Sequence, residues 1–256
     1  MKIFALVEGS YSVDATKQFM PFNAEIDKAA DRPASIFIHV NPFLIKTATD
    51  LIVLDTGLGY KDENDELLIH RHIRNAGFEP KDVSLVLMSH LHYDHSGGLV
   101  VKRNGSLEPS FPQARHVIQL KEWETAIAGK SSSYHKEIFQ ALKSKAAITF
   151  VEGSGTLRPG INYELSGGHS PFHQVFLIES EGKKCFFGGD ELPEPSQLIR
   201  KFVAKYDYDG RKAMLLREEY GKKAVAEGWT CLFYHAKVMC IGKVLWQDDH
   251  FKVIPA

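Results

Sequence analysis

The sequence predicts a single mixed α/β domain that spans residues 1–256. Segments rich in Ile, Val and Phe alternate in groups with amphipathic, charged segments, so that strands, helices, strands and helices follow one another. No low-complexity stretch, repeat of fixed period or clear linker divides the chain. The composition, with 44% apolar and 25% charged residues, is ordinary for a globular protein and allows a sizeable core.

Each expected element follows from its residue pattern and from the residues that end it. Strands are expected where β-branched and aromatic residues run between Asn, Pro and Gly, and helices where apolar residues recur at helical spacing. The expected strands are 2–9, 34–47, 50–57, 83–88, the start of 114–129, 147–153, 161–168, 173–180, 184–190, 229–235 and 242–247. The expected helices are 62–77, the second half of 114–129, 133–145 and a charged region within 196–227.

The charge balance gives no reason to expect a polyanionic partner. The chain has 31 basic and 32 acidic residues and a formal net charge of -1, so we expect no binding to nucleic acid or membrane. The apolar run near the N-terminus is too short for a signal peptide, and no stretch is long enough to span a membrane. Cys185, Cys231 and Cys240 lack a disulfide or zinc-binding spacing and are expected in the core of a cytoplasmic protein. The expected assembly is a monomer or a homodimer.

The segment SHLHYDHSGG, residues 89–98, follows directly on an apolar strand. In an extended or tightly turning segment His90 and His92 can face one point, and Asp94 and His95 can face a neighbouring one. One short loop could therefore hold two metal ions. The glycine pair 97–98 is expected to supply the positive φ angles that so compact a loop needs.

A second His-x-His sequence serves as an internal control. His70 and His72 have the same spacing, but they lie in an expected helix, where positions i and i+2 point about 200° apart. They cannot bind one metal ion together, so we expect both to be solvated surface residues. His-x-His spacing alone is therefore weak evidence for metal binding. The 89–98 segment is stronger evidence because it follows an apolar strand.

Four side chains cannot saturate two metal ions, so further ligands are expected at other strand ends. His169, Asp190 and His235 each come at, or within a short glycine turn of, the end of an apolar or aromatic run. Nitrogen and oxygen ligands without thiolate suit Zn²⁺ and also admit Fe, Mn or Co. His173 could orient a ligand from behind. The remaining histidines stand outside any cluster and are expected to bind no metal: His39, His116, His135 and His250.

These motifs resemble the metallo-β-lactamase-fold hydrolases, whose signature is His-x-His-x-Asp-His, and the resemblance covers about residues 36 to 240. LIVLDTGLG, SHLHYDHSGG, SGGHSPFHQ, FFGGD and FYH stand in the order found in that superfamily. The resemblance implies an αββα sandwich of two mixed β-sheets flanked by helices. It also implies two divalent metal ions, one held by His90, His92 and His169 and one by Asp94, His95 and His235, with Asp190 as the bridge. Asp55 would hold the signature loop by hydrogen bonds.

Within the superfamily the chain is most similar to the N-acyl homoserine lactonase and organophosphate-hydrolase group, because little chain follows His235 and because an aspartate stands at 190. The similarity implies opening of a lactone or small ester by a hydroxide shared between the two cations, with Asp94 carrying a proton to the departing oxygen. The alternatives are a phosphotriester, thioester or other ester hydrolase, a tRNA-processing type of nuclease, and a non-hydrolytic iron protein of the same fold.

One position departs from the lactonase pattern. Several such lactonases carry a substrate-binding tyrosine three residues after the bridging aspartate, where this chain has Pro193. Tyr93 is taken as a candidate catalytic replacement or a packing residue, and Tyr206 and Tyr208 are the other candidates. Phe172, Leu192, Phe202 and the segment 20–45 could receive an acyl chain or could belong to the core or a dimer contact.

Overall fold

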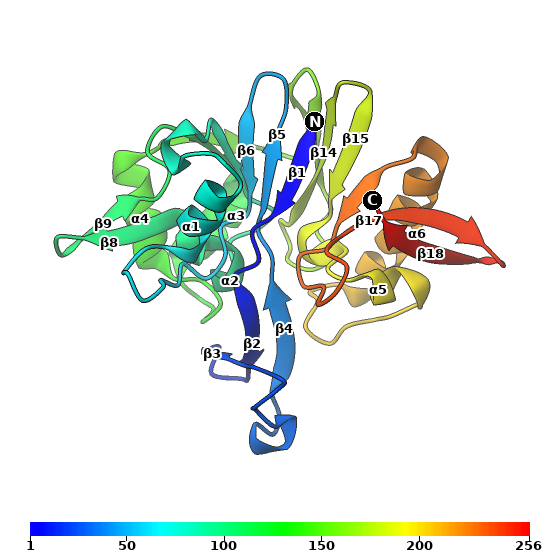
Figure 1. The fold of residues 1–256 in the computed structure, drawn as a ribbon, viewed down its shortest axis with the longest axis horizontal. Coiled ribbons are helices and arrows are strands. Elements are labelled where there is room, and N and C mark those ends of the chain that lie inside the picture. The colour runs from blue at the N-terminus through cyan, green and yellow to red at the C-terminus, as the bar shows by residue number, and fades with distance from the viewer.

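The computed structural model describes all residues, 1–256, and contains two large β-sheets packed face to face. A six-stranded sheet has the order β1-β5-β6-β7-β10-β11, and a seven-stranded sheet has the order β12-β13-β14-β15-β16-β17-β18. Helices α1, α3 and α4 lie outside the first sheet, and α5 and α6 lie outside the second (Figure 1). The predicted αββα sandwich of mixed sheets is confirmed.

The strands and helices have the following bounds. The first sheet comprises β1 (Lys2–Ala5), β5 (Phe43–Lys46), β6 (Leu51–Leu54), β7 (Leu85–Leu87), β10 (Arg115–Gln119) and β11 (Ala147–Val151). The second comprises β12 (Gly155–Arg158), β13 (Ile161–Leu165), β14 (Gln174–Ser180), β15 (Lys183–Phe187), β16 (Thr230–Leu232), β17 (Ile241–Gln247) and β18 (His250–Pro255). The helices are α1 (Leu68–Asn75), α2 (Tyr93–Ser96), α3 (Leu120–Ala128), α4 (Lys136–Lys145), α5 (Pro195–Ile199) and α6 (Gly210–Glu227).

Two smaller sheets complete the fold. The strands β2 (Gly9–Val13), β3 (Phe19–Pro21) and β4 (Ile36–Val40) form an antiparallel sheet in the order β3-β2-β4, which projects beyond the sandwich (Figure 1). The strands β8 (Val100–Arg103) and β9 (Ser106–Pro109) form a hairpin beside α4.

Period-two alternation in the central strands explains the four layers. In β6, Ile52 and Leu54 belong to the apolar cluster between the sheets, whereas Val53 belongs to the cluster under α1, α3 and α4. In β15, Phe187 points between the sheets and Phe186 packs toward α6 with Tyr220. Because both faces of these strands are buried, they read as continuous apolar runs rather than as alternating ones.

Several sequence predictions are corrected in detail. The charged region 196–227 is two helices separated by the irregular segment 200–209, and the chain closes with the hairpin β17–β18 rather than with one strand. His70 is not solvated: its side chain is buried, and its Nε2 lies 3.0 Å from the Ser110 carbonyl oxygen. It faces the interior because α1 packs this side against the loop before β10, a contact between residues 40 apart in the sequence.

Other predictions are decided by burial. Cys185 and Cys231 are buried core residues, as predicted, and Cys240 is half-buried. Of the proposed apolar walls, Phe43 is fully buried core, and so is Leu192. No helix has the length and hydropathy needed to cross a lipid bilayer.

Candidate metal centre

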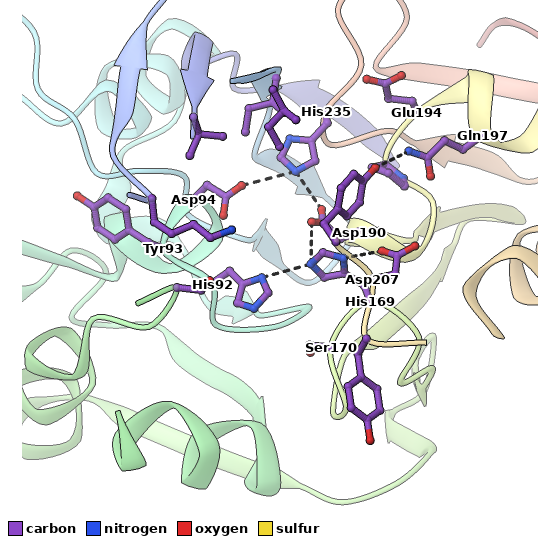
Figure 2. A pocket seen from close by; sticks show the side chains of 18 of the residues that line it. His92, Tyr93, Asp94, His169, Ser170, Asp190, Glu194, Gln197, Asp207 and His235 are labelled. Atoms are coloured by element: carbon purple, nitrogen blue, oxygen red, sulfur yellow. Dashed lines mark hydrogen bonds and ion pairs between the residues drawn. The ribbon is translucent and has the colours of Figure 1, made fainter. Parts of the chain in front are cut away.

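One edge of the sandwich, where several strands end, gathers the side chains that the sequence singles out. Parallel neighbours β6 and β7 end there, followed by Asp55 and by the 89–98 segment. Parallel neighbours β15 and β16 end there too, followed by Asp190 and His235, and the loop after β13 adds His169. Parallel strands bring their carboxyl ends to one edge, which is why distant positions meet (Figure 2).

The predicted ligands form two groups joined by Asp190. The ring nitrogens of His90, His92 and His169 include a set lying within 4.8 Å of one another, and so do ligand atoms of Asp94, His95 and His235. Asp190 Oδ2 lies 3.1 Å from His169 Nε2, and Asp190 Oδ1 lies 3.1 Å from His95 Nε2 and 3.0 Å from His235 Nε2. The carboxylate thus directs one oxygen to each group.

The second nitrogen of each ring explains how these histidines are oriented. His95 Nδ1 donates to Asp55 Oδ2 at 2.7 Å, His169 Nδ1 to Asp207 Oδ1 at 2.9 Å, and His235 Nδ1 to the His39 carbonyl oxygen at 2.6 Å. His90 Nδ1 lies 3.0 Å from Ser89 Oγ, whose own hydrogen goes to Asp55. With hydrogen on Nδ1, each of these four rings turns an unprotonated Nε2 toward the centre, which is the tautomer that a metal requires. His92 is turned the other way, because its Nδ1 faces the centre and lies 3.2 Å from His169 Nε2.

The unmet polar atoms at the centre test whether cations fit. His90 Nε2, His95 Nε2 and Asp190 Oδ1 are buried and make no hydrogen bond of normal geometry, although the last two atoms lie 3.1 Å apart. Buried polar atoms without hydrogen bonds destabilise a fold. A cation bound between these three atoms would satisfy them, because all three are electron-pair donors. An all-nitrogen and oxygen donor set suits Zn²⁺ and admits Fe, Mn or Co. The residues present fit two divalent cations.

The electrostatics of the centre point in the same direction. Burial would raise the pKa of Asp190, but His235, His95 and His169 around it hold that pKa well below its usual value. Burial lowers the pKa of His95, yet Asp190 and Asp94 outweigh it and raise that pKa well above normal. The carboxylates therefore draw positive charge to the point where the ring nitrogens converge.

Comparison with known proteins places this geometry in a family. A profile of the Metallo-beta-lactamase superfamily matches residues 36–235. The chain belongs to this superfamily. It is 30% identical over 159 residues to N-acyl homoserine lactonase AiiA of Bacillus thuringiensis subsp. kurstaki, a match that covers 54% of this chain and 58% of the relative. It is 32% identical over 148 residues to N-acyl homoserine lactonase AttM of Agrobacterium fabrum, covering 54% and 47%. The match thus spans about half the length of these curated relatives.

Solved structures show the same fold over the whole chain. A probable metal-dependent hydrolase from Staphylococcus aureus has a TM-score of 0.77 and 25% identity, and the match covers 100% of this chain and 96% of that one. AidC, a dizinc quorum-quenching lactonase solved with a product of N-hexanoyl-L-homoserine type, has a TM-score of 0.74 and 23% identity, covering 99% and 94%.

The signature loop of this superfamily member is held in place by close backbone contacts. A Cβ on Gly97 would lie 2.2 Å from the Leu58 carbonyl oxygen, and one on Gly98 would lie 2.1 Å from the Thr56 carbonyl oxygen. Neither glycine has a positive φ, so the predicted reason for the pair is wrong. The glycines are needed because the loop after β6 leaves no room for a side chain.

Buried carboxylates outside the signature were missed by sequence reasoning. Glu122 of α3 accepts hydrogen bonds from Leu91 N at 3.1 Å and Ser170 Oγ at 3.2 Å, so it touches both loops that carry the first ligand group. Glu191 Oε1 accepts from the backbone N–H groups of Gly168 and His169 at 2.6 and 2.9 Å. An acidic residue in a helix or after a strand gives no sequence signal of this kind, because its donors are distant in the chain.

The other residues singled out fall into place around the centre. His173 is not turned toward the cluster of ligand atoms: its Nε2 accepts from Asp190 N at 3.1 Å, so it positions the bridging carboxylate. Tyr93 stacks on His135 with ring centroids 4.0 Å apart, and its hydroxyl points away from the histidines (Figure 2). Tyr93 thus packs the rim of the site. His39 contributes its carbonyl oxygen to His235, whereas His116 and His250 lie elsewhere.

A cavity of about 900 Å³ opens over the centre. Asp94, Asp190 and the histidines at 92, 169 and 235 lie in it. Apolar walls come from the projecting sheet, with Phe19 and residues 36–38, and from the 193–208 region, with Phe202. Tyr206 lies at the histidine end, its ring centroid 6.1 Å from that of His169 and its hydroxyl 3.0 Å from Gln197 Nε2.

Proposed function

We propose that this chain is a two-metal hydrolase that opens lactones or small carboxylic esters, with N-acyl homoserine lactones as the first substrates to test. The observation that carries the proposal is the pair of ligand groups joined by Asp190 at the floor of an apolar-walled cavity. The lactonase names of the curated relatives and the dizinc lactonase fold neighbour support it. A cavity of this size suits a small-molecule ligand.

His90, His92, His169, Asp94, His95, His235 and Asp190 would hold the two cations, with Zn²⁺ as the first choice. Two bound divalent cations would supply a nucleophilic water of lowered pKa and would polarise the substrate carbonyl. The chain's own residues then orient the ester and handle protons. Asp94 lies on the cavity floor, with its Oδ2 3.6 Å from His235 Nε2, so its carboxylate is placed to carry a proton to the departing oxygen.

Tyr206 is the tyrosine best placed to replace the one expected at Pro193. The Tyr206 hydroxyl oxygen accepts from Gln197 Nε2, which leaves its own hydrogen free to donate to a substrate carbonyl. Partial burial raises the pKa of Tyr206 to about 12, so this hydrogen stays in place near neutral pH. Tyr93 is directed away from the ligand groups, and Tyr208 is largely exposed. The apolar walls would receive the acyl part of the ester.

The decisive experiment is a substrate panel with the metal-reconstituted protein. Lactones, phosphotriesters and thioesters are assayed with wild type, His92→Ala and the matched control His72→Ala, which changes a half-buried histidine of α1 away from the cavity. We expect lactone turnover that chelation abolishes, that metal addition restores, and that only His92→Ala removes. Tyr206→Phe should lower turnover, and Tyr208→Phe should not. Turnover that survives chelation refutes the proposal.

The alternatives make distinct predictions in the same experiment. Preferred turnover of a phosphotriester or thioester would change the substrate class while leaving the metal centre in place. Salt-sensitive RNA cleavage would indicate a nuclease, which the net charge of -1 does not favour. The single-domain organisation, the cytoplasmic location and the monomer or homodimer stay predictions.

A further inference from the structure

The segment 200–209, between α5 and α6, forms one wall of the cavity and is fastened to the loop that carries His169. Phe202, Tyr206 and Tyr208 of this segment line the cavity. Tyr208 N donates to the His169 carbonyl oxygen at 3.0 Å, and Asp209 N donates to the Gly168 carbonyl oxygen at 2.8 Å. Most side chains of the segment are exposed or half-exposed, and its other supports are hydrogen bonds from α5 and α6. Its position therefore depends in part on the His169 loop.

A buried ion pair makes this dependence specific to the imidazole of His169. Asp207 accepts from His169 Nδ1 at 2.9 Å and from Arg217 Nη2 at 3.0 Å, and the two charged side chains are 0% and 1% exposed (Figure 2). Arg217, on α6, also donates through Nε to the Glu191 carbonyl oxygen at 2.6 Å and through Nη1 to the Phe202 carbonyl oxygen at 3.0 Å. One arginine thus ties the wall, α6 and the backbone beside Asp190 to the carboxylate that touches His169.

A buried pair of this kind is weak evidence for stability, because desolvation offsets most of the attraction. Its geometry instead suits a role at the metal centre. A cation on His169 Nε2 fixes the hydrogen on Nδ1 and strengthens its hydrogen bond to Asp207. By linkage, whatever strengthens that bond also orders the segment that carries Asp207, and an ordered segment in turn favours the cation.

We propose that Asp207 and Arg217 are positioning residues that couple metal binding at His169 to ordering of the 200–209 wall of the cavity. The proposal rests on the metal centre proposed above but not on the identity of the substrate. Loading the centre would then also complete the surface that receives the substrate. A protein without metal would have a looser wall as well as no nucleophile.

Two measurements on the full chain test the coupling, and neither uses hydrolysis. Amide hydrogen exchange is followed in peptides covering 200–209 and, as a reference, in peptides covering β17 and β18, with and without Zn²⁺. We expect zinc to slow exchange in 200–209 by about 10-fold and to leave the reference unchanged. Zinc affinity is measured by competition with a chelator, and Asp207→Asn should weaken it about 10- to 100-fold.

Asp209→Asn is the matched control. It changes a neighbouring aspartate whose carboxylate caps α6 through Lys212 N at 2.9 Å, and asparagine caps a helix equally well. It should keep both the affinity and the zinc-dependent protection, whereas in Asp207→Asn saturating zinc should no longer protect 200–209. Asp207→Asn leaves the charge of Arg217 buried without its partner. A double variant, Asp207→Asn with Arg217→Met, is therefore measured beside the single variant.

The outcomes separate this proposal from the proposed function. Equal exchange in 200–209 with and without bound zinc in wild type overturns the coupling, and so does wild-type zinc affinity in both Asp207 variants. Lactone turnover by such variants would leave the hydrolase proposal standing. Loss of affinity together with loss of zinc-dependent protection supports the coupling whatever substrate the enzyme turns over.

Discussion

Replacing Asp55 by asparagine should damage the metal centre through a hydrogen bond rather than through a lost ligand. Asp55 is fully buried and accepts three hydrogen bonds, from Ser89 N at 2.7 Å, Ser89 Oγ at 2.6 Å and His95 Nδ1 at 2.7 Å. Its φ of 51° lies in the left-handed region, which asparagine also tolerates. The substitution therefore changes the chemistry of the side chain and leaves the backbone alone.

The magnitude follows from counting donors. The two oxygens of Asp55 face three donors, two on Ser89 and one on His95. Asparagine has only one acceptor oxygen, and its NH₂ group would face at least one of these donors. If the NH₂ group faces His95 Nδ1, the ring moves its hydrogen to Nε2 and cannot bind a cation there; if the oxygen faces His95, the NH₂ group meets the Ser89 N–H. Either arrangement should cost roughly 3 kcal/mol of unfolding free energy and about 10- to 100-fold in metal affinity.

Asp50 provides the control because it flanks the same strand. Asp50 precedes β6 and Asp55 follows it; Asp50 is also buried, and it accepts from Ser84 Oγ at 2.9 Å and pairs with Arg158. Asp50→Asn should lower the urea midpoint without changing zinc affinity in chelator competition. Asp55→Asn should change both. Zinc affinity in Asp55→Asn equal to wild type would refute the tautomer reasoning.

Three further predictions concern groups around the site and in the core. Glu122→Gln should weaken zinc binding with little change in the urea midpoint, because it removes a buried negative charge beside the proposed ligands while its amide oxygen can still accept from Leu91 N–H; unchanged affinity in a chelator titration would contradict this. Gly97→Ala should destabilise the fold by roughly 1–3 kcal/mol in urea unfolding, because its Cβ would meet the Leu58 carbonyl oxygen at 2.2 Å. Burial lowers the pKa of His116 to about 4, so between pH 6.5 and 4 the unfolded chain binds more protons than the folded one. The unfolding free energy should therefore fall by about 2 kcal/mol from pH 7 to 5 through this group, and the fall should be smaller in His116→Gln.

Most of the candidate site could be predicted from local sequence because the proposed ligands stand at strand ends. The strand before His90 and the apolar runs before Asp190 and His235 place the ligands at one edge, so all seven predicted ligands meet. The seven-stranded sheet was predicted only in part. The β8–β9 hairpin was missed although its Asn104-Gly105 turn is a strong hairpin signal.

What the sequence could not predict depends on contacts between distant residues. Asp207 and Asp209 stand in one charged stretch, KYDYDG, and nothing local separates the residue that holds His169 from the residue that caps α6. His70 faces Ser110 and Phe111 instead of solvent because α1 packs against a loop 40 residues away. A helical period gives the spacing of side chains but does not say which face the rest of the fold will cover.

The proposed two-metal centre would explain why so many carboxylates surround it. Two divalent cations would bring four positive charges, of which Asp94 and Asp190 would offset two. Four buried carboxylates beyond the proposed ligands would offset more of this charge. Each accepts a hydrogen bond from a proposed ligand ring or from the backbone next to one: Asp55, Glu122, Glu191 and Asp207. Burial raises the pKa of Asp55 and of Glu122, which marks the cost of keeping these groups charged in the interior. Cations nearby remove part of that cost, so metal binding should stabilise the loops as well as complete the site.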